Sequence, residues 1–155
     1  MISNATPLIC LSKINKLWLL KKCFDIIIIP NAVKEEVLVE DKGGYSVIKD
    51  AIEEGWIKVA EPRNRIDYGL GKGENAAINL AHEKKDKVII DDSVAIKVAK
   101  SLNIEVIRTT STLFIAVQKN IIDKKEALIL LNNLIDIGYY ISPKYYSILF
   151  DKLRE

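Results

Sequence analysis

The chain has 155 residues, of which 49% are hydrophobic and 28% charged, an ordinary composition for a globular protein with one apolar core. No apolar run reaches the roughly 18 residues that span a bilayer. The first residues also lack the basic region, apolar run and small-residue cleavage site of a secretory signal. We therefore expect a cytoplasmic protein without a membrane partner. The net charge of +2 permits a nucleic-acid partner without requiring one.

Five short apolar segments predict β-strands. The run at residues 25–30 is continuous, β-branched and ended by proline, which is typical of a strand buried on both faces. The other four predicted strands cover residues 1–3, 56–62, 87–91 and 104–109.

Helical patterns alternate with these strands. One helix is expected directly after residue 3, and Gly55 and Pro30 give natural stop and start signals for two others. After that first helix, the predicted helices cover residues 15–23, 30–40, 45–55, 73–85, 93–102, 111–119, 124–138 and 143–155. Strands that alternate with helices of about ten residues predict right-handed βαβ units and a parallel sheet. The longest irregular stretch is the glycine-rich, charged segment 61–73.

A few acidic residues fall near predicted strand ends. Asp91 and Asp92 directly follow a buried strand, Glu74 begins a helix, and Glu36 lies beside the apolar face of its helix while Glu35 is turned about 100° away. Each has a structural explanation alone: Asp92 or Ser93 caps the next helix, and Glu74 is a first-turn acid worth about 0.3–1 kcal/mol. Together they predict an acidic cluster, because the carboxyl ends of parallel strands share one edge of the sheet.

Such a cluster indicates a metal site. Two carboxylates about 4 Å apart repel by about 1 kcal/mol in water and by about 4 kcal/mol at an effective dielectric constant of 20. Three or four together require protons or a cation, and hard oxygen ligands select Mg²⁺ or Mn²⁺. A metal held in this way orients water and neutralises a phosphodiester during cleavage.

Four motifs in this order resemble the PIN-domain family: "SNATPLI", "IIIIPNAVKEEV", "GKGENAAINLA" and "VIIDDSVAIKVAKSLNIEVIRT". The closest likeness is to the small prokaryotic, VapC-like branch related to the toxin nucleases of toxin–antitoxin pairs. The resemblance covers about residues 1–120 and implies a three-layer α/β/α sandwich with a central parallel sheet. Residues 123–155 are expected to form an accessory helical element within a single domain, 1–155.

The resemblance also implies an activity and its residues. Family members are typically Mg²⁺- or Mn²⁺-dependent ribonucleases, and dimers are usual, so RNA, an antitoxin protein and a second copy of the chain are the implied partners. By position, the implied catalytic acids and metal ligands are Glu36, Glu74 and Asp91 or Asp92. Thr6 matches a hydroxyl residue that helps to hold the site.

Asn4 departs from the family pattern, which has aspartate at this position. An amide oxygen accepts a hydrogen bond or weakly ligates a cation, but it carries no charge. Losing one charge weakens metal binding by about 1–4 kcal/mol, which is several-fold to several-hundred-fold in affinity. The alternative function is therefore a catalytically inactive PIN-fold module that binds RNA or protein. A receiver-like signalling domain is a weaker alternative, because Asn4 and Arg108 fit its pattern poorly.

Arg108 occupies a predicted strand end, where the related branch usually has glycine. It is expected either to contact a phosphate or to pair with a site acid. Basic residues near the 61–73 segment either line an approach for RNA or form ordinary solvated surface: Arg63, Arg65, Lys72, Lys84, Lys85 and Lys87.

The remaining reactive side chains predict structural roles. Cys10 and Cys23 are flanked by apolar residues and form no C-x-x-C pair, so we expect buried, reduced thiols. His82 lies among charged residues on a helix, where an exposed position is expected. The tyrosines near the C-terminus predict core packing or a dimer contact rather than base stacking: Tyr139, Tyr140, Tyr145 and Tyr146.

Overall fold

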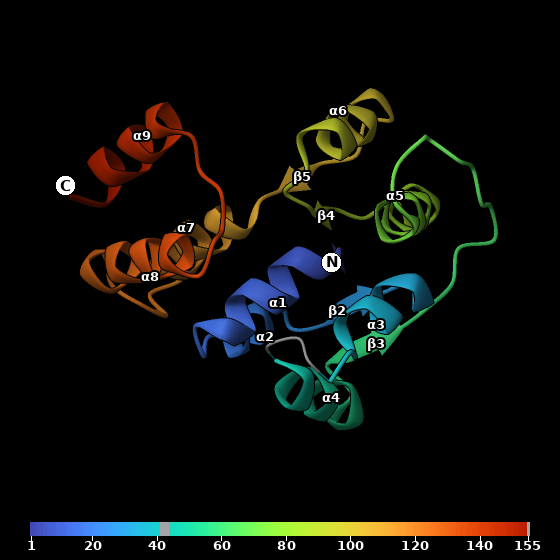
Figure 1. The fold of residues 1–155 in the computed structure, drawn as a ribbon, viewed down its shortest axis with the longest axis horizontal. Helices are drawn as coiled ribbons and strands as arrows, with labels where there is room; N and C mark the ends of the chain where they lie inside the picture. The colour runs from blue at the N-terminus through green and yellow to red at the C-terminus, as the bar shows by residue number, and fades with distance from the viewer. Residues whose placement is uncertain (41–43, 155) are drawn as a thin grey trace.

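A parallel sheet of five short strands lies at the centre of the molecule (Figure 1). The computed structural model describes residues 1–40 and 44–154. The strand order is β3-β2-β1-β4-β5, and every pairing is parallel. The strands are β1 (Ile2–Ser3), β2 (Ile27–Ile29), β3 (Ile57–Val59), β4 (Val88–Ile89) and β5 (Val106–Ile107).

Side chains of the central strands pack on both faces of the sheet. Ile27 and Ile29 are fully buried in one apolar cluster, whereas Ile28 between them packs against a second cluster on the opposite face. This alternation explains the continuous isoleucine run, since a strand covered on both faces has no solvent side. Ile2 of β1 pairs with Ile28 on one side and Val88 on the other, so β1 is the central strand.

Helices cover both faces. The bounds are α1 (Ala5–Lys13), α2 (Trp18–Phe24), α3 (Asn31–Val37), α4 (Tyr45–Glu54), α5 (Lys72–Lys84), α6 (Ser93–Ser101), α7 (Thr109–Gln118), α8 (Lys124–Asp136) and α9 (Pro143–Arg154). Helices α5 and α6 share one apolar cluster with β1 and β4, while α1, α3 and α4 share another with β2 and β3. The predicted three-layer α/β/α sandwich is confirmed. None of the helices in the described ranges is both long and apolar enough to cross a bilayer.

The C-terminal helices form a third apolar cluster. Residues from α7, α8 and α9 pack there with Leu19 and Cys23 of α2. Figure 1 shows α8 and α9 next to α7, on the side of the molecule away from α5. The segment after α7 therefore packs against the layer of helices that also contains α2.

Element boundaries differ from the predicted ones in detail. Every strand is shorter than its predicted run, and α3 ends at Val37 because Leu38, at φ −92° and ψ 46°, leaves the helical region. Helix α4 ends at Gly55 in the left-handed conformation, as the glycine predicts. The last residue of the predicted helix 143–155 lies outside the described residues.

The irregular segment between β3 and α5 is held by two asparagines of α5. The Asn79 side chain accepts a hydrogen bond from the Ile66 N–H and donates to the carbonyls of Ile66 and Asn75. The Asn75 side chain accepts from Tyr68 and donates to Leu70 and Asp67. These amides fix the loop that leads into α5, and with it the start of that helix.

We expect Asn79→Ala to lower the free energy of unfolding by about 1–3 kcal/mol, because the buried Asn79 amide makes three partly buried hydrogen bonds that the variant loses. Urea denaturation measures this loss. Trypsin should also cleave after Arg63 and Arg65 faster than in the parent protein. Asn64→Ala, an exposed position on the same loop, is the matched control. Equal trypsin sensitivity of the Asn79 variant and the parent would show that Asn79 does not hold the loop.

Candidate active site

Polar residues follow the central strands at one edge of the sheet. Asn4 follows β1 directly, Asp91 lies two residues after β4, and Arg108 follows β5 directly. Because these three strands are neighbours and parallel, their carboxyl ends meet. An open pocket of about 590 Å³ lies there, and its lining comes from α1, α5, α6, the strand ends and the α8–α9 connection: Thr6, Cys10, Lys13, Glu74, Asp91, Asp92, Ser93, Arg108, Ile137, Gly138, Tyr139 and Tyr140.

Asp91 is held by three hydrogen bonds. Its Oδ1 accepts from the Thr109 N–H at 3.0 Å and from the Tyr139 hydroxyl at 2.5 Å. Its Oδ2 accepts from the Thr109 hydroxyl at 2.6 Å. The carboxylate is therefore fixed against the start of α7 and against the segment that follows α8.

Tyr139 stays protonated in this arrangement. Burial, together with the negative charge of Asp91 and the hydrogen bond to it, raises the pKa of the Tyr139 phenol. The hydroxyl therefore acts as a donor at neutral pH. The same surroundings affect Cys10, since burial and the charge of Asp91 raise the pKa of its thiol to about 11. A neutral thiol is a poor nucleophile, which leaves Cys10 without a catalytic role at neutral pH.

Asp92 caps helix α6. Its Oδ2 accepts a hydrogen bond from the Ala95 N–H at 2.9 Å, and its backbone is extended, as in a standard N-cap. The side chain is exposed and also lines the pocket. The two aspartates, which the sequence could not separate, therefore have different surroundings: Asp91 is bound by the neighbouring strand end, and Asp92 by its own helix.

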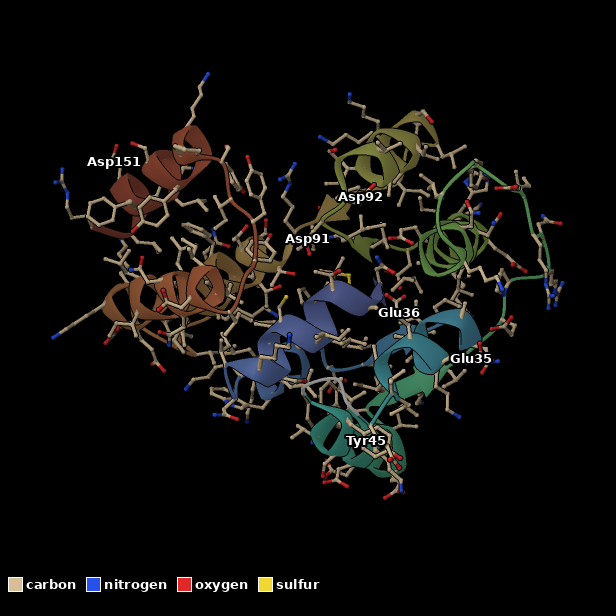
Figure 2. All side chains as sticks on the ribbon, viewed as in Figure 1. Glu35, Glu36, Tyr45, Asp91, Asp92 and Asp151 are labelled. Carbon is tan, nitrogen blue, oxygen red and sulfur yellow. The ribbon has the colours of Figure 1, made fainter. Side chains whose placement is uncertain are left out.

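Glu74 and Glu36 approach this edge from two helices. Glu74 lies in the first turn of α5, with its carboxylate folded back over Gly71 and its side chain in the pocket lining. Glu36 is exposed on α3 and does not line the pocket. Figure 2 shows Glu36 turned toward the middle of the molecule and Glu35 turned outward, as the helical spacing predicts.

Gly73 brings Glu36 and Asn4 together. A Cβ placed on Gly73 would lie 3.0 Å from Glu36 Oε2 and 3.2 Å from Asn4 Oδ1. Both oxygens therefore lie close to Gly73, where an added Cβ would press on them. Asn4 is 3% exposed, and its Oδ1 has no hydrogen-bond partner among the described residues. A buried amide oxygen without a partner costs about 1–3 kcal/mol, which makes this oxygen a candidate for a ligand.

Positive side chains share the pocket. Lys13 and Arg108 line it together with the carboxylates. The Arg108 guanidinium lies 5.4 Å from the centre of the Tyr145 ring, a cation–π distance. In the described part of the chain, no salt bridge involves Arg108. The expectation that it pairs with a site acid is therefore wrong, and the phosphate contact stays a prediction.

The donor chemistry fits a divalent cation, but the present spacing does not form a complete coordination shell. All candidate donors are oxygens, and no salt bridge of residues 1–40 or 44–154 neutralises the four acids. The unpartnered Asn4 oxygen adds a neutral donor beside Glu36. Over these same residues, no three His, Cys, Asp or Glu side chains stand close enough to hold one ion. Glu74, Asp91 and Asp92 line the pocket, whereas Glu36 does not line it and lies beside Asn4 at Gly73.

A family model described as a PIN domain matches residues 1–155. The chain belongs to the PIN-domain family. Among curated proteins and among solved structures, no significant match to the chain exists. PIN domains in general have a nuclease-type fold, use divalent metal ions and commonly bind RNA.

The two residues of this PIN domain that bond Asp91 were not predicted as its partners from the sequence. Thr109 was visible as part of the last motif, but its bonds to Asp91 were not predicted. Tyr139 lies 48 residues from Asp91 in the sequence and belongs to none of the four motifs. Of the two predicted roles, core packing is confirmed for the half-buried Tyr139, Tyr145 and Tyr146. Tyr140 is 82% exposed and does not pack in the core, so a dimer contact stays a prediction for it.

The smaller expectations have mixed outcomes. Both cysteines are free, as expected, and Cys23 is buried, but Cys10 is only half-buried because it faces the pocket. His82 is exposed on α5, as the charged surroundings predict.

We expect Asp92→Asn to keep the free energy of unfolding within about 0.5 kcal/mol of the parent value, because asparagine caps helices as well as aspartate. Asp92→Ala should lower it by about 1 kcal/mol. Urea denaturation distinguishes the two. A loss for Asp92→Asn as large as that for Asp92→Ala would show that charge, and not the cap, is what stabilises α6.

Proposed function

We propose that this PIN domain is a Mg²⁺- or Mn²⁺-dependent endoribonuclease. The observation that carries the proposal is the meeting of Glu74, Asp91 and Asp92 in one pocket at the carboxyl edge of the sheet. Three carboxylates in one open pocket repel one another, and a divalent cation relieves that repulsion. The same pocket contains the positive side chains of Lys13 and Arg108, which suit a negatively charged phosphodiester.

The proposed metal-holding residues are Glu36, Glu74, Asp91 and Asp92. A bound Mg²⁺ or Mn²⁺ would supply Lewis-acid chemistry, by which water is made a better nucleophile and phosphate charge is offset. Asp91 enters this role with its carboxylate held by hydrogen bonds from Thr109 and Tyr139. Asp92 keeps its capping bond and presents its charge from an exposed position.

Three further residues have proposed roles toward the substrate. Arg108, held over the Tyr145 ring, would contact a phosphate of the RNA. Thr6 lies half-buried in the pocket lining and would hold a water or a substrate hydroxyl by hydrogen bonding. Asn4 would do the same with its buried amide oxygen.

The resemblance of the four sequence motifs to the toxin-related branch supports a wider form of the proposal. A toxin–antitoxin-related nuclease would work in the cytoplasm, bind an antitoxin protein and form homodimers. In this proposal residues 1–155 act as one domain, with a nuclease core at about 1–120 and a helical element at about 123–155.

A catalytically inactive module that binds RNA or protein is the second candidate. Asn4 favours it, because an uncharged residue stands where the family pattern has aspartate. The spacing of the acids favours it as well, since within the described ranges no three of them form a ready metal site. Calorimetry with Mn²⁺ separates the two candidates: absence of binding at millimolar metal selects the inactive module.

We expect Glu74→Gln to reduce Mn²⁺-dependent cleavage of a single-stranded RNA by about 10²- to 10³-fold, the cost of removing one group that stabilises the reacting charges. Gel analysis of a labelled RNA measures the rate. Glu35→Gln, a change of the same type on the outward side of α3, should cleave at the parent rate. Unchanged cleavage by the Glu74 variant would remove Glu74 from the site.

We expect Asn4→Asp to have opposite effects without and with metal. Without metal, a carboxylate at a 3% exposed position beside Glu36 should lower the free energy of unfolding. With metal, the added charge should tighten Mn²⁺ binding by about 1–4 kcal/mol and raise the cleavage rate. Thermal unfolding with and without Mn²⁺, together with calorimetry, measures both effects.

Asn64→Asp is the matched control for Asn4→Asp, because it adds the same charge at an exposed loop position. It should change neither metal affinity nor stability by more than about 0.5 kcal/mol. If Asn4→Asp behaved like this control, the Asn4 oxygen would lie outside the reach of the metal.

A further inference from the structure

The connection between α8 and α9 lines the acidic pocket, and one of its side chains hydrogen-bonds an acid there. Tyr139 lies in the connection between α8 and α9, and its hydroxyl contacts Asp91 across 48 positions of sequence. Thr109, the other partner of Asp91, is the first residue of α7 and lies two residues after β5. Tyr139 therefore links the helices after α7 directly to an acid of the pocket.

The backbone of Tyr139 is fixed by the end of α8. Gly138 has φ +98° and donates to the Ile135 carbonyl, while the Tyr139 N–H donates to the Leu134 carbonyl. These two bonds form a Schellman motif, with Gly138 as its left-handed residue. The Tyr139 ring is in addition partly buried in the apolar cluster of α7, α8 and α9. The hydroxyl is thus delivered to Asp91 from a rigid support.

The hydrogen bonds of Asp91 leave a defined number of free lone pairs. A carboxylate offers about four acceptor sites, two on each oxygen. Oδ1 uses both of its sites, for the Thr109 N–H and the Tyr139 hydroxyl, and Oδ2 uses one for the Thr109 hydroxyl. One site remains, and it belongs to Oδ2. Without the Tyr139 bond, Oδ1 would regain a free site, and only the two Thr109 bonds would hold the carboxylate.

We propose that Tyr139 is a positioning residue that, together with Thr109, fixes the Asp91 carboxylate and occupies the second acceptor site of Oδ1, so that only Oδ2 offers a lone pair to a divalent cation. This inference rests on the proposed metal-dependent function. Tyr139 does not touch the cation; it acts through Asp91. In metal sites, groups that orient the ligands in this way typically contribute 10- to 100-fold in metal affinity.

The test compares Tyr139→Phe with Tyr146→Phe. Both remove one phenol hydroxyl from the same part of the chain, but the Tyr146 hydroxyl donates to Asn132 on α8, away from the pocket. Calorimetry with Mn²⁺ should give a dissociation constant about 10- to 100-fold higher for Tyr139→Phe and an unchanged one for Tyr146→Phe. The electron paramagnetic resonance spectrum of saturating Mn²⁺ should also change for Tyr139→Phe, because the cation meets a differently oriented ligand.

A metal-free measurement tests the bond itself. Unfolding of the parent, Tyr139→Phe, Asp91→Ala and the double variant forms a thermodynamic cycle. The Tyr139 substitution should shift the unfolding equilibrium about tenfold more in the parent than in the Asp91→Ala background, since a hydrogen bond to a charged group is lost only in the parent.

The outcomes separate the inference from the proposed function. Equal Mn²⁺ affinity and spectra for Tyr139→Phe and the parent would overturn the positioning role and leave the nuclease proposal intact. Tighter Mn²⁺ binding by Tyr139→Phe would also overturn it, because the hydroxyl would then compete with the cation for Oδ1. Absence of Mn²⁺ binding by the parent would overturn the proposed function and the positioning role with it. Absence of coupling in the cycle would overturn the inference alone.

Discussion

Parallel pairing of the strands is the constraint on which the rest of the structure depends. A parallel sheet sends all of its carboxyl ends to one edge, and the order β3-β2-β1-β4-β5 makes β1 the centre of that edge. Asn4, Asp91 and Arg108 therefore meet although they are far apart in the sequence. The helices that follow the strands begin at the same edge, which brings Glu74 to the same pocket.

The electrostatic balance at this edge depends on position 4, which directly follows β1. Glu36 and the Asn4 oxygen share the space beside Gly73, so an aspartate in place of Asn4 would put two carboxylates next to each other there. The neutral amide avoids that repulsion, and its buried oxygen is left without a partner among the described residues. Three carboxylates, those of Glu74, Asp91 and Asp92, line the pocket. Beside it, Glu36 and Asn4 form a pair that carries a single negative charge.

Most of the scaffold could be predicted from local patterns. The isoleucine run predicts a strand covered on both faces, and Gly55 predicts the end of α4, because these signals act over a few residues. The edge on which the acids lie follows from βαβ topology alone. The roles of Asp91 and Asp92 could not be separated, since both follow the same strand and only one of them reaches Thr109.

The sequence by itself determined the fold class, the sheet edge that carries the polar residues, and the absence of a charge at position 4. These properties follow from periodicity, chain topology and residue identity. Only the tertiary structure decided which oxygens are free and which are bound, because that depends on contacts between distant segments. Tyr139 shows this most directly: the end of α8 fixes it opposite Asp91, and no local pattern connects two residues that meet only when the C-terminal helices pack against α7.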